Sequence, residues 1–221
     1  NKIFDDLSMP YEMIPELSEY CNSKNIEFMS TPFSVEDAKQ IDPYVNYHKI
    51  ASYEISHYRL IEFIAKTGKP TFLSTGAATI DEIDWAVKHF FKNDGNNLTL
   101  LQTTAKYPAP LESLNIYSMD ILKDNFNVPV GLSDHSVDPI IGPVCATALG
   151  ASVIEKHFTL NKKLPGPDHS FALDPVELKE MIKAIRNCEK CLGSKEKIVQ
   201  DHEFELRDFA QRSIQCMKNI S

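Results

Sequence analysis

The segment VPVGLSDHSVDPIIGPVCATALGASVIEKHF, residues 128–158, contains two short apolar runs at 129–132 and 152–155 that are separated by a helix-like stretch. Such alternation is typical of parallel strands joined by crossover helices. Polar residues follow both runs, with Asp134 and His135 after the first and Lys156 and His157 after the second. We expect a βαβ unit that presents these polar side chains at one edge of a sheet.

The same alternation extends over the rest of the chain. A helical pattern at 11–24, with Pro10 just inside its start, precedes a strand-like run at 26–31. Further strand-like runs lie at 47–51, 71–74 and 98–103, each followed by a helix-like segment. Two of the predicted helices carry N-terminal caps, since Thr79 stands three residues before Glu82 and Asp174 stands three before Glu177. Repeated βα units of this kind predict a parallel sheet.

The polar residues at the strand ends distinguish a closed barrel from an open, doubly wound sheet. In a (β/α)8 TIM barrel all strand ends converge on one mouth, whereas a doubly wound sheet concentrates its site at one switch point. Here every predicted strand ends in polar residues, and no glycine-rich phosphate fingerprint opens a helix. We therefore predict an α/β fold of the (β/α)8 type. Six strands are found where eight are needed, so we expect 1–221 to be one barrel domain that lacks its first two βα units.

Composition restricts the kinds of partner. The formal net charge is −8, with 43% hydrophobic and 24% charged residues, and no apolar run approaches the roughly 18 residues of a membrane span. An acidic chain is poorly suited to nucleic acid or to an anionic membrane. The first residues lack the pattern of a secretory signal, and five cysteines in a long chain do not suggest a disulfide scaffold. We expect a cytoplasmic protein that binds small molecules and creates any positive field locally.

Several motifs occur in a fixed order along the chain. They are Ser30-Thr31-Pro32-Phe33, Lys49-Ile50-Ala51-Ser52-Tyr53-Glu54, Leu73-Ser74-Thr75-Gly76, Tyr107-Pro108-Ala109-Pro110, Gly131-Leu132-Ser133-Asp134-His135, Ile154-Glu155-Lys156-His157-Phe158-Thr159, Gly166-Pro167-Asp168-His169 and Gln211-Arg212-Ser213-Ile214. Their order and spacing resemble the N-acetylneuraminate (sialic acid) synthase family. The resemblance implies a metal-dependent condensation of phosphoenolpyruvate with an open-chain N-acetylated amino sugar, similar to N-acetylmannosamine. The products would be a nonulosonic acid and phosphate.

The resemblance also implies a homodimer, and the chain departs from the family in three respects. A strand-one glutamate and a strand-two lysine of the family have no match, and the C-terminal antifreeze-like domain is not present in 1–221. After the threonine of the sixth barrel strand, family members usually carry asparagine or serine, where this chain has Ala105-Lys106. One sugar or phosphate contact is therefore expected to differ.

His135 and His157 are the predicted metal ligands. They end the last two predicted strands, and two imidazoles at neighbouring strand ends suit one divalent cation. The resemblance points to Mn²⁺ or Mg²⁺, which would polarise the sugar aldehyde. The alternative is that each histidine makes an ordinary hydrogen bond at the rim. Asp134 either orients the His135 ring or caps the following helix.

Lys49 is the predicted centre of an anion seat. Phosphoenolpyruvate carries a phosphate and a carboxylate, and a lysine charge with several hydroxyl donors suits both groups. The alternative is that the hydroxyls cap helices and the lysine extends to solvent. The strand-end hydroxyls assigned to substrate binding are those of Ser30, Thr31, Ser52, Ser74, Thr104 and Ser133.

Tyr107 and Asp168 complete the predicted site together with Lys49 as the groups expected to take part in catalysis. Tyr107 could donate a phenolic hydrogen bond to substrate or could simply pack in its proline-rich turn. The resemblance suggests that Asp168 binds a sugar hydroxyl or assists proton transfer, although an aspartate in such a loop also forms turns.

Two other functions remain open at this point. A Schiff-base aldolase would use Lys49 as its nucleophile in the same barrel. A barrel-derived binding or regulatory protein would have lost activity, in keeping with the unmatched glutamate. The motifs do not distinguish N-acetylmannosamine from its 6-phosphate or from a legionaminic-type precursor.

Overall fold

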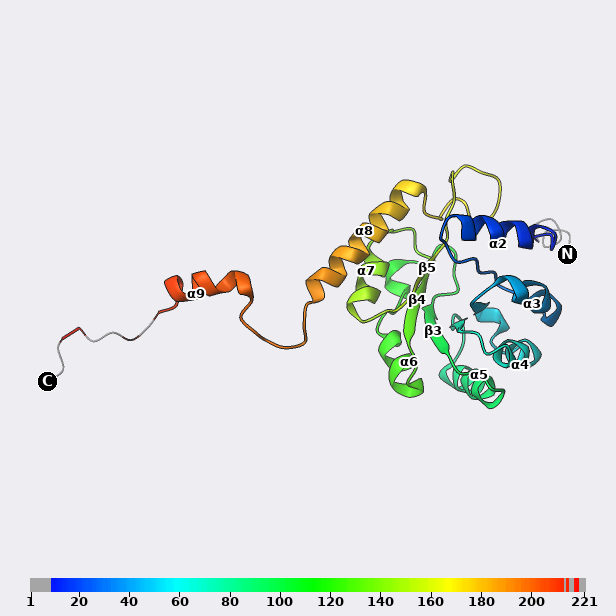
Figure 1. Cartoon of the computed structure of the whole chain (residues 1–221), viewed down its shortest axis with the longest axis horizontal. Helices are drawn as coiled ribbons and strands as arrows, with labels where there is room; N and C mark the ends of the chain where they lie inside the picture. Colours follow the sequence, from blue (N-terminus) through cyan, green and yellow to red (C-terminus); the bar gives the residue numbers. More distant parts are fainter. Residues whose placement is uncertain (1–8, 213, 215–216, 219–221) are drawn as a thin grey trace.

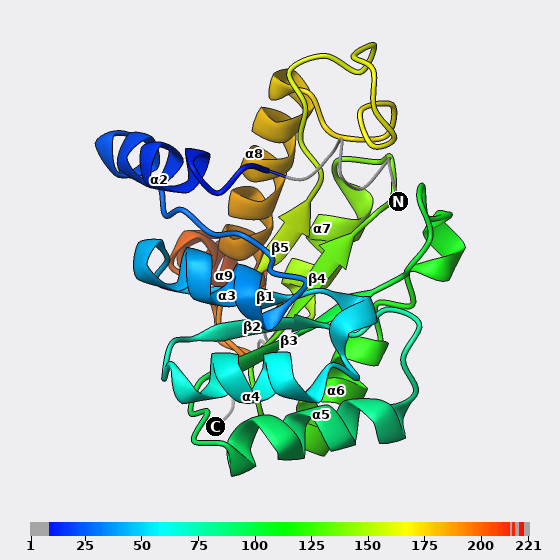
Figure 2. The ribbon, with the colours of Figure 1, turned by 90° about the vertical axis from the view of Figure 1, so that its right-hand side faces the viewer.

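The computed structural model of the chain describes residues 9–212, 214 and 217–218. Its centre is one parallel sheet of five strands in the order β1-β2-β3-β4-β5 (Figures 1 and 2). The strands are β1 (His48–Ile50), β2 (Thr71–Ser74), β3 (Leu98–Thr103), β4 (Val130–Asp134) and β5 (Ile154–Lys156). Because each strand pairs in parallel with the next one in the sequence, the predicted βα repeat is confirmed for these five strands.

The sixth predicted strand, at 26–31, is wrong. These residues belong to no strand and form no ladder hydrogen bonds with other described residues, and Ile26 is 62% exposed. A strand requires a paired backbone as well as an apolar pattern, and β1 pairs only with β2 in the described sheet. The sheet is consequently an open half-barrel with β1 and β5 at its edges.

Helices connect and cover the strands. The crossover helices are α4 (Tyr58–Lys66), α5 (Ile80–Lys92), α6 (Ser118–Phe126) and α7 (Ile141–Ala148); α2 (Met13–Ser23) and α3 (Val35–Ile41) precede the sheet, and α8 (Pro175–Leu192) and α9 (Phe204–Ala210) follow it. Short 3₁₀ turns are η1 (Asp42–Tyr44), η2 (Ser52–Glu54), η3 (Leu111–Ser113) and η4 (Asp201–Glu203). The predicted capping boxes at Thr79 and Asp174 are confirmed at the starts of α5 and α8.

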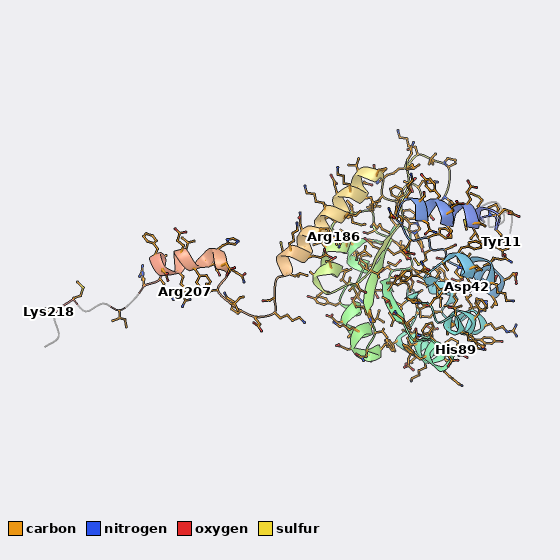
Figure 3. The ribbon with its side chains drawn as sticks, in the orientation of Figure 1. Tyr11, Asp42, His89, Arg186, Arg207 and Lys218 are labelled. Carbon is orange, nitrogen blue, oxygen red and sulfur yellow. The ribbon has the colours of Figure 1, made fainter. Side chains whose placement is uncertain are left out.

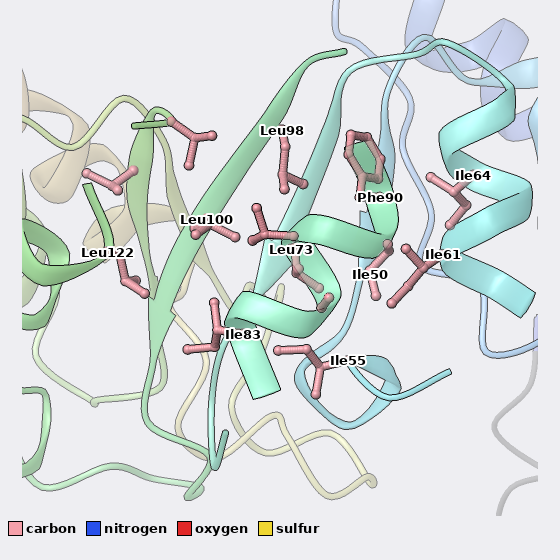
Figure 4. Close-up of a cluster of buried hydrophobic side chains, with 14 of the residues drawn as sticks. Ile50, Ile55, Ile61, Ile64, Leu73, Ile83, Phe90, Leu98, Leu100 and Leu122 are labelled. Carbon is pink, nitrogen blue, oxygen red and sulfur yellow. The ribbon is translucent and has the colours of Figure 1, made fainter. Parts of the chain in front are cut away.

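The hydrophobic core lies between one face of the sheet and helices α4 to α7. Leu73 and Leu100 of the sheet pack with Ile61 of α4 and Phe90 of α5 (Figure 4). These side chains are fully buried, and burial of each such group stabilises the fold by about 1.5–3 kcal/mol relative to exposure. Successive side chains along a strand point to opposite faces of the sheet. Because one set is buried in the core, the residues between them must point to the other face.

The C-terminal segment stands apart from this body. Figure 1 shows α9 beyond the end of α8, and Figure 3 shows Arg207 on α9 and Lys218 far from body residues such as Asp42. Ser213 of the closing sequence motif lies outside the described residues. Across the described part of the chain, the helices are too short or too polar to cross a membrane.

Candidate active site

A row of polar side chains lies on the sheet face opposite the core, at the carboxyl ends of the strands. The register pairs Thr103 with Ser133 and Ser133 with Glu155, and the same alternation brings Lys49 and Ser74 to this face. All five residues line one cavity of about 370 Å³. The predicted convergence of polar strand ends therefore occurs, as parallel strands of a barrel require.

Eight of the predicted site residues line this cavity, and three do not. Ser30 instead lines a second cavity of about 660 Å³ between α2 and α3. The Thr104 hydroxyl donates to the Ser113 carbonyl at 2.6 Å and is not part of the lining. Asp168 lies at the rim, where Oδ2 is 3.5 Å from Nδ1 of His157. The predicted residues in the cavity wall are Thr31, Lys49, Ser52, Ser74, Tyr107, Ser133, His135 and His157.

Lys49 presents a buried ammonium group to the cavity. The residue is 4% exposed, and its Nζ lies 3.6 Å from Oε1 of Glu155 and donates to the Ile50 carbonyl at 3.3 Å. Burial lowers the pKa of Lys49, and the Glu155 carboxylate opposes that shift. The same Glu155 oxygen accepts a 2.5 Å hydrogen bond from the Ser133 hydroxyl. Lys49 is therefore held by charge inside the cavity and does not extend to solvent.

The Lys49–Glu155 pair also reports the curvature of the sheet. Its members belong to β1 and β5, which are opposite edges of the five-stranded sheet. In a flat sheet these strands would lie about 19 Å apart, from four spacings of about 4.8 Å, and the two side chains could not meet. The sheet must therefore curl around the cavity, as the wall of a barrel does.

Two buried polar atoms of the cavity wall have no hydrogen-bond partner among the described residues. They are Oγ of Ser74 and Oε2 of Glu54. Burial raises the pKa of the Glu54 carboxyl, with His57 and Lys49 acting in the opposite direction. Buried polar groups are nearly always paired in folded proteins, so these atoms are available to a ligand or to water. The Ser52 hydroxyl, by contrast, accepts from the Gly76 amide at 3.0 Å.

The two histidines lie side by side at the mouth, with ring centroids 5.5 Å apart. Nδ1 of His135 lies 2.8 Å from the Thr104 carbonyl, which can only accept, so Nδ1 carries the proton and Nε2 has the free lone pair. Burial lowers the pKa of His135, which favours the neutral ring that a metal requires. Nδ1 of His157 faces Asp168. A carbonyl that fixes an imidazole, as Thr104 does for His135, is typical of metal-binding histidines.

The donor set is incomplete as a metal centre. Within 9–212, 214 and 217–218, no three histidine, cysteine, aspartate or glutamate residues are grouped so as to hold a metal ion. The histidines fit two positions of a cation whose other ligands would be water or substrate. Tyr107 stacks on His135 with ring centroids 4.0 Å apart, so its ring packs against the site. Burial also raises the pKa of the Tyr107 phenol.

The Asp134 carboxylate makes no hydrogen bond to the His135 ring, and it does not cap α7. Its Oδ2 accepts from Lys156 Nζ at 2.7 Å and its Oδ1 accepts from the Ser136 amide at 2.8 Å. The carboxylate thus binds the turn after β4 and the end of β5, and the start of α7 is instead held by Asp138, which accepts from the Ile141 amide at 2.7 Å. The partner of Asp134 could not be predicted from the sequence, because Lys156 lies on another strand and is not a neighbour in the chain.

Three further residues line the cavity, although the sequence predicted no role for them: Glu54, Glu155 and Lys156. Each of them lies among polar residues at or just after the end of a strand, and this position is the feature of the sequence from which a place in the site could have been predicted. The strand register shows which of these side chains share a face and which ones meet across the sheet.

Comparison with known proteins gives consistent results. The NeuB family profile matches residues 1–197. The chain is 45% identical over 223 residues to an uncharacterized protein of Methanocaldococcus jannaschii, covering 99% of this chain and 65% of that protein. It is 40% identical over 212 residues to N,N'-diacetyllegionaminic acid synthase of Legionella pneumophila, covering 92% of this chain and 58% of the synthase. The chain thus spans less than two thirds of the length of these two relatives.

One solved structure supports the same relation at the level of the fold. The N-acetylneuraminic acid synthetase of Leptospira borgpetersenii, in complex with citrate, has a TM-score of 0.87 to this chain at 31% identity. The match covers 96% of this chain and 75% of that one.

Proposed function

Because the chain belongs to the NeuB family, we propose that it forms the greater part of a synthase that condenses phosphoenolpyruvate with an open-chain N-acetylated amino sugar. The products are a nonulosonic acid and inorganic phosphate. The observation that carries the proposal is the cavity of about 370 Å³ in which Lys49, strand-end hydroxyls and two histidines converge. This cavity has a binding site for an anion next to a binding site for a cation.

The anion seat is formed by Lys49 with the hydroxyls around it. A buried ammonium in a chain of net charge −8 supplies the local positive field that phosphoenolpyruvate needs. Ser74 Oγ is buried and has no partner among the residues that the structure describes, so it can donate to a phosphate or carboxylate oxygen. Ser52, Ser133 and Thr31 line the same wall and complete the seat.

We propose that His135 and His157 hold Mn²⁺ or Mg²⁺. When bound, such an ion polarises a sugar aldehyde as a Lewis acid. The Thr104 carbonyl orients the His135 ring, and the Asp168 carboxylate lies 3.5 Å from the His157 ring. Stacking of Tyr107 on His135 limits the movement of that ring.

The remaining chemistry is assigned to side chains of the cavity wall. C3 of phosphoenolpyruvate attacks the aldehyde carbon, water then adds at C2, and phosphate leaves. The pKa of Glu54 is raised by burial, so its carboxyl is suited to hold and transfer a proton beside Lys49. Asp168, which lies at the rim next to His157, is assigned to accept from a sugar hydroxyl, and Tyr107, which stacks on His135, is assigned to flank the sugar. Seating both reactants side by side supplies much of the rate.

We further propose that the half-barrel is completed to a (β/α)8 barrel by three strands that the described sheet does not contain, making 1–221 part of one barrel domain. The side of β1 that pairs with no described strand and the exposed Phe33, at 64%, support this proposal because both leave surface for further elements. A cytoplasmic homodimer that acts on small molecules, and not on nucleic acid or membranes, is proposed from the charge and the family resemblance.

The amino sugar is proposed to be similar to N-acetylmannosamine, with its 6-phosphate and a legionaminic-type precursor as alternatives. One observation favours a second reaction class, since burial lowers the pKa of Lys49 and so favours the neutral amine of a Schiff-base aldolase. Glu155 at 3.6 Å opposes it by stabilising the charged form.

The test uses the purified protein with phosphoenolpyruvate, each candidate sugar and Mn²⁺, and measures phosphate release together with the sugar acid formed. Activity that is lost when both His135 and His157 are changed to Ala, and in chelator, is expected. Trapping of a substrate adduct on Lys49 by borohydride would instead support the aldolase. Absence of both outcomes would favour a binding protein that has lost activity.

A further inference from the structure

Asp134 and Lys156 form a buried ion pair next to the two histidines. Their side chains are 0% and 3% exposed, and Lys156 Nζ donates to Asp134 Oδ2 at 2.7 Å. The ammonium also donates to the Ser136 carbonyl at 2.6 Å and to the Asp138 carbonyl at 3.2 Å. Its three protons therefore all have acceptors, at the last residue of β4 and in the turn that follows it.

The position of this pair relates it to the site. Asp134 and Lys156 are register partners in the β4–β5 ladder, and each immediately precedes one of the histidines. Lys156 binds residues on both sides of His135, namely Asp134 and Ser136, and is covalently joined to His157. One ammonium group thus connects the backbone segments that carry both imidazoles.

Stability alone is a poor reason for a buried ion pair. Removing two charges from water costs several kcal/mol per ion, and well-packed apolar residues of similar size are often as stabilising. What apolar side chains cannot supply is three directional bonds from one atom to a turn. The packing is also tight, since a Cβ on Gly142 of α7 would lie 2.9 Å from Asp134 Oδ2. The carboxylate is therefore confined on its α7 side as well.

We propose that Asp134 and Lys156 are positioning residues that hold His135 and His157 at a fixed separation and so set the affinity of the two-histidine site for a divalent cation. The positioning itself follows from the contacts above, whereas the consequence for the cation rests on the proposed function. Asp134 and Lys156 act through the histidines and not on the substrate.

The experiment compares three proteins: the unchanged protein, the single variant Lys156→Met, and a double variant that carries both Asp134→Asn and Lys156→Met. The double variant removes both charges, so it is expected to recover thermal stability that the single variant loses. Two measurements follow: the nuclear Overhauser effect between the ring protons of His135 and His157 without metal, and the affinity for Mn²⁺ by calorimetry. We expect the ring signal to weaken in the double variant and Mn²⁺ affinity to fall about 10- to 100-fold.

Lys69→Met is the matched control. It breaks the ion pair of Lys69 with Asp42, 2.8 Å long, which lies at the amino ends of β1 and β2 and not at the mouth. This variant should lower thermal stability while leaving the ring signal and Mn²⁺ affinity unchanged.

The outcomes separate the two proposals. The positioning role is overturned if the double variant keeps both the ring signal and the Mn²⁺ affinity of the unchanged protein. It is also overturned if the unchanged protein itself shows no ring signal. A ring signal that weakens in the double variant, in a protein that binds no Mn²⁺, supports the positioning role and contradicts the metal site of the proposed function.

Discussion

Replacing Lys49 by Met tests the anion seat most directly. At an effective dielectric constant of about 20, a unit charge 3.6 Å from the ammonium, the distance of the Glu155 carboxylate, interacts with it by about 4.6 kcal/mol. A substrate anion shares the ammonium with Glu155, so we assign it about half of this value, or roughly 2–3 kcal/mol. Affinity for phosphoenolpyruvate should therefore fall about 30- to 150-fold.

Loss of folding would not account for such a change. In the variant, Glu155 keeps the Ser133 hydroxyl at 2.5 Å, and its side chain is 36% exposed, so it is not left as a buried unpaired charge. Thermal unfolding should shift by only a few degrees, and calorimetric titration with phosphoenolpyruvate measures the affinity. Lys66→Met, which removes an exposed lysine paired with Glu62, is the control for a lost positive charge. An affinity within threefold of the unchanged protein would refute the assignment of Lys49.

Three further changes test other parts of the structure. Ser74→Ala removes a buried hydroxyl without a described partner, so stability should hold or rise slightly while phosphoenolpyruvate affinity falls about 2- to 12-fold; equal affinity by titration would contradict this. The pKa of buried His48 is lowered by burial, so the unfolded chain binds its proton first and stability falls as pH drops below about 6.5, by at most about 1.4 kcal/mol per pH unit. In the His48→Gln variant, the free energy of unfolding measured with urea should depend less on pH between pH 7 and 5 than in the unchanged protein. Asp42 does not interfere in this range, because its pKa is lowered and it titrates at more acidic pH. The same pH dependence in both proteins would contradict the role of His48. Thr79→Ala removes the capping box of α5 and should lower the free energy of unfolding by about 1 kcal/mol without changing phosphoenolpyruvate affinity; an unchanged urea midpoint would show that the cap contributes little.

The repeat of strands and helices could be predicted from the sequence because it depends on local patterns. Apolar runs of four to six residues, capping residues and polar strand ends all carry their own signal, and the common side of the polar ends follows from parallel strands. The run at 26–31 shows the limit, because its pattern is that of a strand but its pairing depends on backbone elsewhere.

The site was predictable in its position but not in its internal contacts. That Lys49 and Ser133 line the cavity could be predicted from their places at strand ends. The Glu155 contact that joins them depends on how far the sheet curls, and the Asp134–Lys156 pair depends on register. Neither quantity is encoded in a window of neighbouring residues, because each arises from packing across the whole sheet.

The ion pair between the first and last strands of the sheet has a consequence for the order of events during protein synthesis. Lys49 leaves the ribosome well before Glu155, and about 100 residues at roughly 5–20 residues per second take about 5–20 s. Until β5 joins the sheet, the Lys49 amine lacks the carboxylate that holds it in the cavity. In an emerging chain, therefore, the Lys49 ammonium stays solvated until the last strand of the sheet has been made and has joined the others.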